Sequence, residues 1–133
     1  MQANRMNIQA NRMNFQVIIG YDKPDQYFEK AILERISDLL GGCTAYHAKG
    51  YWFDDAFDTK DNYTGKLMEE HAFKMELSCE IEKADHIYSL IQDIVTSAID
   101  MFGIQADWVH VEAMPSMALH FSAKDRMKAK ISA

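Results

Sequence analysis

Acidic and aromatic residues concentrate between residues 50 and 70, and together they could bind an organic cation. Gly50-Tyr51-Trp52 opens this stretch, Phe57 and Tyr63 follow, and Glu69-Glu70 ends it. Residues 54–70 contain six acidic residues against two lysines. Aromatic faces attract onium ions, and a carboxylate can accept a charge-assisted hydrogen bond from an ammonium group. Two interpretations stay open: a solvated hairpin connection, or an anionic, aromatic-walled pocket for a cationic ligand.

Other kinds of active site have little support in the sequence. There is no glycine-rich phosphate loop, which makes nicotinamide, flavin and ATP sites of the usual kinds unexpected, and no Gly-x-Ser-x-Gly nucleophile motif. Cys43 and Cys79 lie in apolar runs and are predicted to be buried thiols. We predict no metal site, because the spacings of five isolated histidines match no ligand motif: His47, His71, His86, His110 and His120.

Length and charge narrow the class of protein further. The 133 residues fit one domain. The net charge is −6 and the pI about 5.3, which argues against nucleic-acid binding, because displacing phosphate counterions needs a basic excess. The sequence contains no apolar run of about 18 residues, so no membrane span is predicted. The polar amino terminus does not resemble a secretory signal.

The ends of the chain differ in pattern from its middle. The sequence QANRMN occurs at residues 2–7 and again at 9–14, so we interpret residues 1–14 as a duplicated, frayed start region. Residues 15–123 are predicted to form one domain. Residues 124–133 contain four cations and one acid and are predicted to be a flexible basic tail.

Hydrophobic periodicity predicts an α+β domain. The strongest signal is strict alternation over residues 71–81, which is typical of an antiparallel strand with one buried face. Apolar residues at helical spacing predict two helices, ended by Gly41-Gly42 and Gly103. Pro24 belongs in the first turn of the earlier helix, with Asp22 or Lys23 near its cap. The predicted elements are a strand at 15–21, a helix to Leu40, a strand at 43–53, a hairpin connection at 54–68, the alternating strand, a helix at 84–102, a strand at 105–113 interrupted by Pro115, and a short fifth strand at 117–122.

This order is that of a ferredoxin-like, PII-like βαββαβ fold, with a four-stranded antiparallel sheet and both helices on one face. The other face of the sheet is predicted to be partly apolar, because Trp108, His110 and Glu112 alternate with Val109, Val111 and Ala113. Such a face favours self-association. We expect a homotrimer.

Residues 15–122 resemble the phage-encoded enzymes that destroy S-adenosylmethionine, formerly called hydrolases and now understood as lyases. The resemblance is carried by the glycine–aromatic–aromatic segment Gly50-Tyr51-Trp52 and by Glu69-Glu70 before the alternating strand at 73–79. A closing pair of apolar strands matches residues 109–121.

The resemblance implies a trimer of PII-related protomers that binds S-adenosylmethionine between subunits without metal or cofactor. The substrate carboxylate would attack its own γ-carbon, giving 5′-methylthioadenosine and L-homoserine lactone. Glu70, or else Glu69, would bind the substrate ammonium, and Tyr51, Trp52 or Tyr63 would support it or line the sulfonium site. The resemblance also implies a cytoplasmic location in a phage-infected bacterium, where loss of the methyl donor would act against restriction. The alternatives are a non-catalytic PII-like trimer that binds a nucleotide or another ligand, and a plain structural oligomer.

Overall fold

A computed structural model describes residues 9–55, 64–106 and 109–132 of the chain. Phe57, Tyr63 and Trp108 therefore lie outside the described residues. The elements, in chain order, are β1 Arg12–Tyr21, α1 Gln26–Leu40, β2 Thr44–Phe53, β3 Leu67–Glu80, a 3₁₀ turn Ile81–Lys83, α2 Ala84–Phe102, β4 Val109–Ser116 and α3 Ala123–Ser132. No helix among the described residues is long and apolar enough to cross a membrane.

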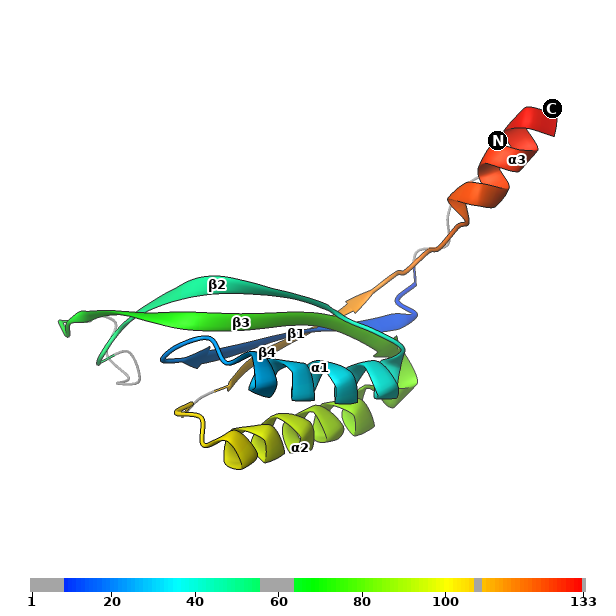
Figure 1. The fold of residues 1–133 in the computed structure, drawn as a ribbon. Helices are drawn as coiled ribbons and strands as arrows, with labels where there is room; N and C mark the ends of the chain where they lie inside the picture. Colours follow the sequence, from blue (N-terminus) through cyan, green and yellow to red (C-terminus); the bar gives the residue numbers. More distant parts are fainter. Residues whose placement is uncertain (1–8, 56–63, 107–108, 133) are drawn as a thin grey trace.

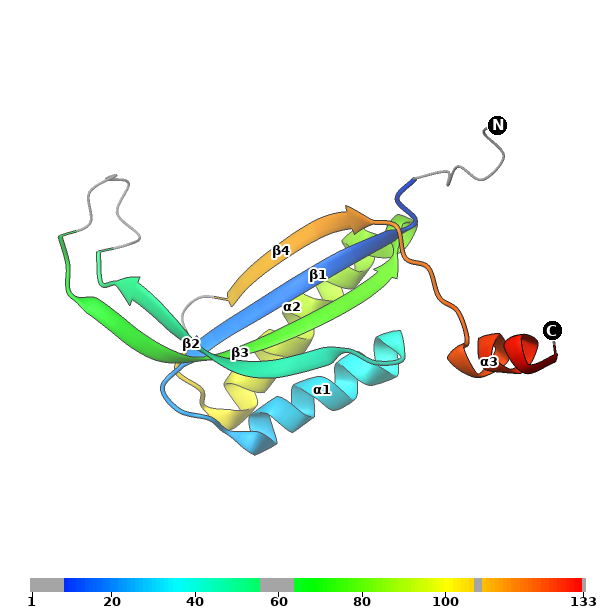
Figure 2. The same cartoon turned by 90° about the horizontal axis from the view of Figure 1, so that it is seen from above.

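The strands form one antiparallel sheet in the order β2-β3-β1-β4, and α1 and α2 cover one of its faces (Figure 1). This arrangement confirms the predicted α+β, ferredoxin-like fold. β2 and β3 are longer than the helix layer and continue past the ends of α1 and α2 (Figure 2). Because α1 and α2 cover only one face of the sheet, the other face turns away from the helices (Figure 1). We call it the open face.

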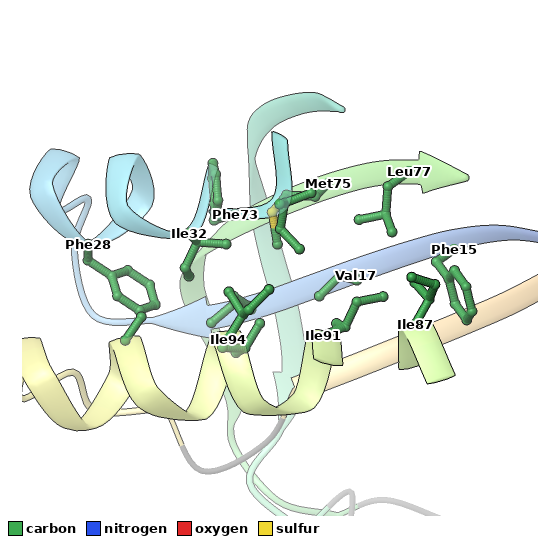
Figure 3. Close-up of a cluster of buried hydrophobic side chains, with 14 of the residues drawn as sticks. Phe15, Val17, Phe28, Ile32, Phe73, Met75, Leu77, Ile87, Ile91 and Ile94 are labelled. Atoms are coloured by element: carbon green, nitrogen blue, oxygen red, sulfur yellow. The ribbon is translucent and has the colours of Figure 1, made fainter. Parts of the chain in front are cut away.

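The core lies between the sheet and the two helices (Figure 3). Alternate residues of β1 and β3, among them Val17 and Met75, are fully buried and point toward α1 and α2. Ile32 of α1 and Ile91 of α2 meet them from the other side. The predicted alternation is confirmed over β3, whereas Ile81 begins the 3₁₀ turn.

Both long helices end at a glycine, and α1 also begins at a side-chain cap. The Asp25 side chain caps α1, because it accepts hydrogen bonds from the amides of Tyr27 at 3.0 Å and Phe28 at 3.1 Å. The predicted cap at Asp22 or Lys23 was wrong: Pro24 precedes the cap, and the capping side chain is that of Asp25. Gly41 and Gly103 end the helices in the left-handed conformation, as predicted.

Pairing between distant segments moves several strand boundaries. β1 begins at Arg12, inside the repeat that we expected to be frayed, because Arg12 pairs with both Glu80 and Ser116. β4 runs through Pro115 to Ser116, and residues 117–122 form no strand. Proline is tolerated there because β4 is an edge strand and needs hydrogen bonds on one side only.

The carboxyl-terminal segment also differs from the prediction. Residues expected to form a flexible tail belong to α3, which lies away from the sheet (Figures 1 and 2). The Ser122 hydroxyl accepts a hydrogen bond from the Asp125 amide at 3.2 Å, and the alanine, lysine, methionine and arginine that follow are strong helix formers. A cap and high local propensity therefore account for a helix that has no core to pack against.

Candidate functional site

A cavity of about 760 Å³ lies on the open face, near the end of the sheet where β2 and β3 extend beyond the helices. Its volume is in the range of small-molecule binding sites. All four strands and the segment after α2 contribute to it, through Ile18, Gly20, Asp22, Gly50, Tyr51, Trp52, Glu70, Gln105, Val109 and His110.

Two glycines make room for the Glu70 carboxylate within this cavity. Glu70 lies opposite Gly50 in the β2–β3 ladder, and Gly20 belongs to β1 on the other side of β3. A Cβ atom at Gly20 would lie 2.5 Å from Glu70 Cδ and 2.9 Å from its Oε2, which is a steric overlap. A Cβ at Gly50 would lie 3.4 Å from Glu70 Cγ, an ordinary contact. The side chain of Glu70 therefore lies across the backbone of β1 at Gly20.

The environment of Glu70 favours the protonated form of its carboxyl group. Partial burial raises its pKa, since desolvation penalises the charged form, and the nearby negative charge of Asp22 acts in the same direction. The Trp52 side chain acts in the opposite direction, because an indole N–H beside the carboxyl group stabilises its charged form. Burial is the largest of the three effects.

The other predicted site residues are divided between the two faces. Trp52 lines the cavity with Glu70, and Tyr51 borders it although 58% of the residue is exposed. Glu69 points to the opposite face, as neighbours in a strand do. Its carboxylate lies 3.3 Å from Lys49 Nζ, and both side chains are exposed. Tyr63 lies outside the described residues.

Sequence reasoning missed three polar residues of the cavity: Asp22, Gln105 and His110. His110 was expected to be an isolated surface residue, but β4 pairs with β1 and so carries it to the cavity. The side chain of His110 also lies 3.1 Å from Glu112 Oε1. Among the described residues, no lysine or arginine lines the cavity, so its formal charge is negative.

A second polar cluster lies on the helix-facing side of the sheet, formed by Glu29, His47 and His71. We predicted that the histidines would be isolated, but the rings of His47 and His71 are 4.8 Å apart. They are diagonal neighbours on β2 and β3, a proximity that depends on strand register. Burial, and the neighbouring His47, lower the pKa of His71. A carboxylate and two imidazoles are a donor set that could bind a metal ion.

Comparison with known proteins identifies the fold but not a family. No protein-family profile and no curated protein matches the chain. Among solved structures, the divalent ion tolerance protein CutA1 from Ehrlichia chaffeensis superimposes with a TM-score of 0.55 at 9% identity, covering 84% of this chain and 87% of that one. CutA1 from Shewanella sp. SIB1 gives 0.53 at 10% identity, with coverages of 94% and 97%. A phage SAM lyase in the apo state gives 0.46 at 14% identity, with coverages of 87% and 98%. At such low identities, the CutA1 likenesses concern the fold alone: this chain has a CutA-like α+β fold.

Proposed function

We propose that this protein is a lyase that cleaves S-adenosylmethionine into 5′-methylthioadenosine and L-homoserine lactone, at the cavity that contains Glu70. The observation that carries the proposal is the Glu70 carboxyl group, partly buried between two glycine positions and lining the same cavity as Trp52. S-adenosylmethionine carries an ammonium and a sulfonium group. A negatively charged cavity beside an indole ring can bind both, through charge-assisted hydrogen bonds and cation–π contacts.

The charge of the cavity separates this proposal from the binding of a nucleotide phosphate. A phosphate site needs cationic side chains or clustered backbone amides, and no lysine or arginine lines the described part of the cavity. The same arrangement leaves the substrate carboxylate without a cationic partner. An unpaired carboxylate is the better nucleophile, so the arrangement suits a substrate that attacks itself.

The chemical step then requires no protein nucleophile. Glu70 binds the α-ammonium and folds the amino-acid arm so that the substrate carboxylate faces the γ-carbon. A C–O bond forms while the C–S bond breaks, and methylthioadenosine departs with the electron pair on sulfur. The positive and negative charges cancel as the ring closes, and no proton is transferred. Positioning of this kind can contribute about 7–11 kcal/mol.

We further propose that the protein is a homotrimer whose subunits cover the open face. Tyr46 and Met114 lie on this face, 39% and 65% exposed, and a neighbouring copy would shield them from water. The same contact would close the cavity from outside. Substrate would then bind between subunits, and the loss of water would strengthen its interaction with Glu70.

The second candidate function, a non-catalytic ligand-binding trimer, is favoured by the likeness to CutA1 structures. The two candidates differ in what happens to the substrate. Purified protein is incubated with S-adenosylmethionine, and the products are separated by chromatography. A lyase yields methylthioadenosine together with homoserine lactone. Intact substrate would support the ligand-binding protein, and homoserine formed directly would indicate hydrolysis.

Glu70→Gln and Glu69→Gln form a matched pair for testing the site. Both variants replace a carboxylate by an amide, but only residue 70 lines the cavity. A hydrogen bond to a charged group contributes about 1.5–3 kcal/mol, so we expect Glu70→Gln to lower kcat/KM about 10- to 150-fold. Glu69→Gln should remain within about twofold of the unmodified protein, since exposed ion pairs contribute little. Equal activities of the two variants would remove Glu70 from the mechanism.

A further inference from the structure

The cluster on the helix-facing side of the sheet joins three elements through three potential metal ligands. Glu29 comes from α1, His47 from β2 and His71 from β3. His47 Nε2 lies 2.6 Å from Glu29 Oε1, and His71 Nε2 lies 3.8 Å from Glu29 Oε2. One ligand atom from each residue lies within 4.8 Å of the other two.

The carboxylate of Glu29 is buried and oriented by its neighbours. Only 7% of the residue is exposed. The Tyr21 hydroxyl donates a hydrogen bond to Oε2, and the backbone amide of Asp25 donates another at 3.3 Å. Such outer contacts fix the direction of a metal-binding carboxylate. Oε1 is left facing His47.

The cluster is incompletely satisfied by hydrogen bonds alone. His71 Nε2 is buried and has no hydrogen-bond partner, and its 3.8 Å separation from Glu29 is too long for a hydrogen bond. An unsatisfied buried polar atom costs about 1–3 kcal/mol. A purely structural cluster of Tyr21, Glu29 and His47 leaves this atom unexplained, whereas a cation between the three ligands would satisfy it.

We propose that Glu29, His47 and His71 bind one first-row divalent transition metal ion per protomer. Imidazole nitrogens suit Zn²⁺ and its neighbours rather than Ca²⁺ or Mg²⁺. Zinc–ligand bonds of 2.0–2.2 Å in a tetrahedral site place the ligand atoms about 3.4 Å apart. The 2.6 Å and 3.8 Å separations lie on either side of that value, so small side-chain movements complete the site.

The proposed site is open on one side. The His47 side chain is 51% exposed, against 13% for His71 and 9% for Glu29, so an ion can enter past His47. Three protein ligands leave a coordination position for water, as in zinc sites that bind an exchangeable ligand. This site is separate from the cavity of Glu70, which lies on the open face.

Titration of chelator-treated protein with Zn²⁺ by calorimetry tests the proposal, and Co²⁺ provides a visible absorption spectrum of the ligand field. We expect one ion per protomer and a higher melting temperature with Zn²⁺, because an ion that binds only the folded state stabilises it. His47→Ala should weaken Zn²⁺ binding about tenfold or more. The control is His86→Ala, which removes an exposed histidine of α2 outside the cluster.

His47→Ala is the preferred variant because its side chain is half exposed, and its folding is checked by circular dichroism. His71→Ala and Glu29→Gln should weaken binding as well, and Glu70→Gln should leave it unchanged whether or not the protein cleaves S-adenosylmethionine. The proposal is overturned if unmodified protein binds no Zn²⁺. It is equally overturned if His47→Ala binds Zn²⁺ as tightly as His86→Ala does.

Discussion

Gly20→Ala is the substitution that tests most directly whether the position of the Glu70 carboxylate matters. The added Cβ would lie 2.5 Å from Glu70 Cδ, whereas ordinary contacts begin at 3.4 Å. The carboxyl carbon must therefore move by about 1 Å, since overlap at such a distance is strongly repulsive. A displacement of about 1 Å at a positioned catalytic group can lower the rate about 100-fold. We expect kcat/KM for methylthioadenosine formation to fall by about that factor.

The fold should tolerate the same substitution. Gly20 lies in β1 without a positive φ angle, and alanine is favoured over glycine in a strand by about 0.5–1 kcal/mol. The three atoms nearest to the new Cβ all belong to the flexible Glu70 side chain, which can rotate away. The midpoint of thermal unfolding should therefore stay the same or rise slightly while activity is lost.

Gly50→Ala is the matched control. It also replaces a glycine beside Glu70, but its Cβ would make an ordinary 3.4 Å contact with Cγ. Its kcat/KM should stay within about threefold of the unmodified protein, because less than 0.7 kcal/mol is at stake. Rates are measured by chromatography of methylthioadenosine. Full activity of Gly20→Ala, in a protein that makes methylthioadenosine, would refute the reasoning that the carboxylate must lie over β1.

Three further predictions concern pH, assembly and stability. Burial and Asp22 raise the pKa of Glu70. On the acid side of the pH profile, kcat/KM should therefore fall at a pH above the usual range of a glutamic acid. Asp22→Asn should move this acidic fall to lower pH, and an unchanged profile would contradict its assignment to Glu70. Met114→Glu, at a residue 65% exposed on the open face, should shift the sedimentation coefficient toward the monomer if subunits pack there, and an unchanged value would place the interface elsewhere. Ile32→Ala empties a fully buried core position and should lower the free energy of unfolding in urea by about 2–5 kcal/mol. The exposed Met101→Ala should change it by less than about 0.5 kcal/mol, and equal losses would contradict the described core.

The site was only partly predictable, because the sequence did not choose between Glu69 and Glu70. Adjacent residues of a strand always point to opposite faces, but which face receives each one depends on register. In the structure Glu70 shares the open face with Gly20 and Gly50, while Glu69 pairs with Lys49. Asp22 and His110 were missed for a related reason, since their proximity to Glu70 comes from pairing between segments far apart in the chain.

What the sequence determined by itself was local. The alternation in β3, the apolar stripes of α1 and α2, and the terminating glycines Gly41 and Gly103 follow from interactions within a few residues, and these were predicted correctly. Only the tertiary structure decided which segments became neighbours. It extended β1 to Arg12 and brought His47 and His71 to Glu29. Hydrophobic periodicity indicates which side chains of one helix or strand share a face. Strand order and register determine which residues of other elements that face contacts.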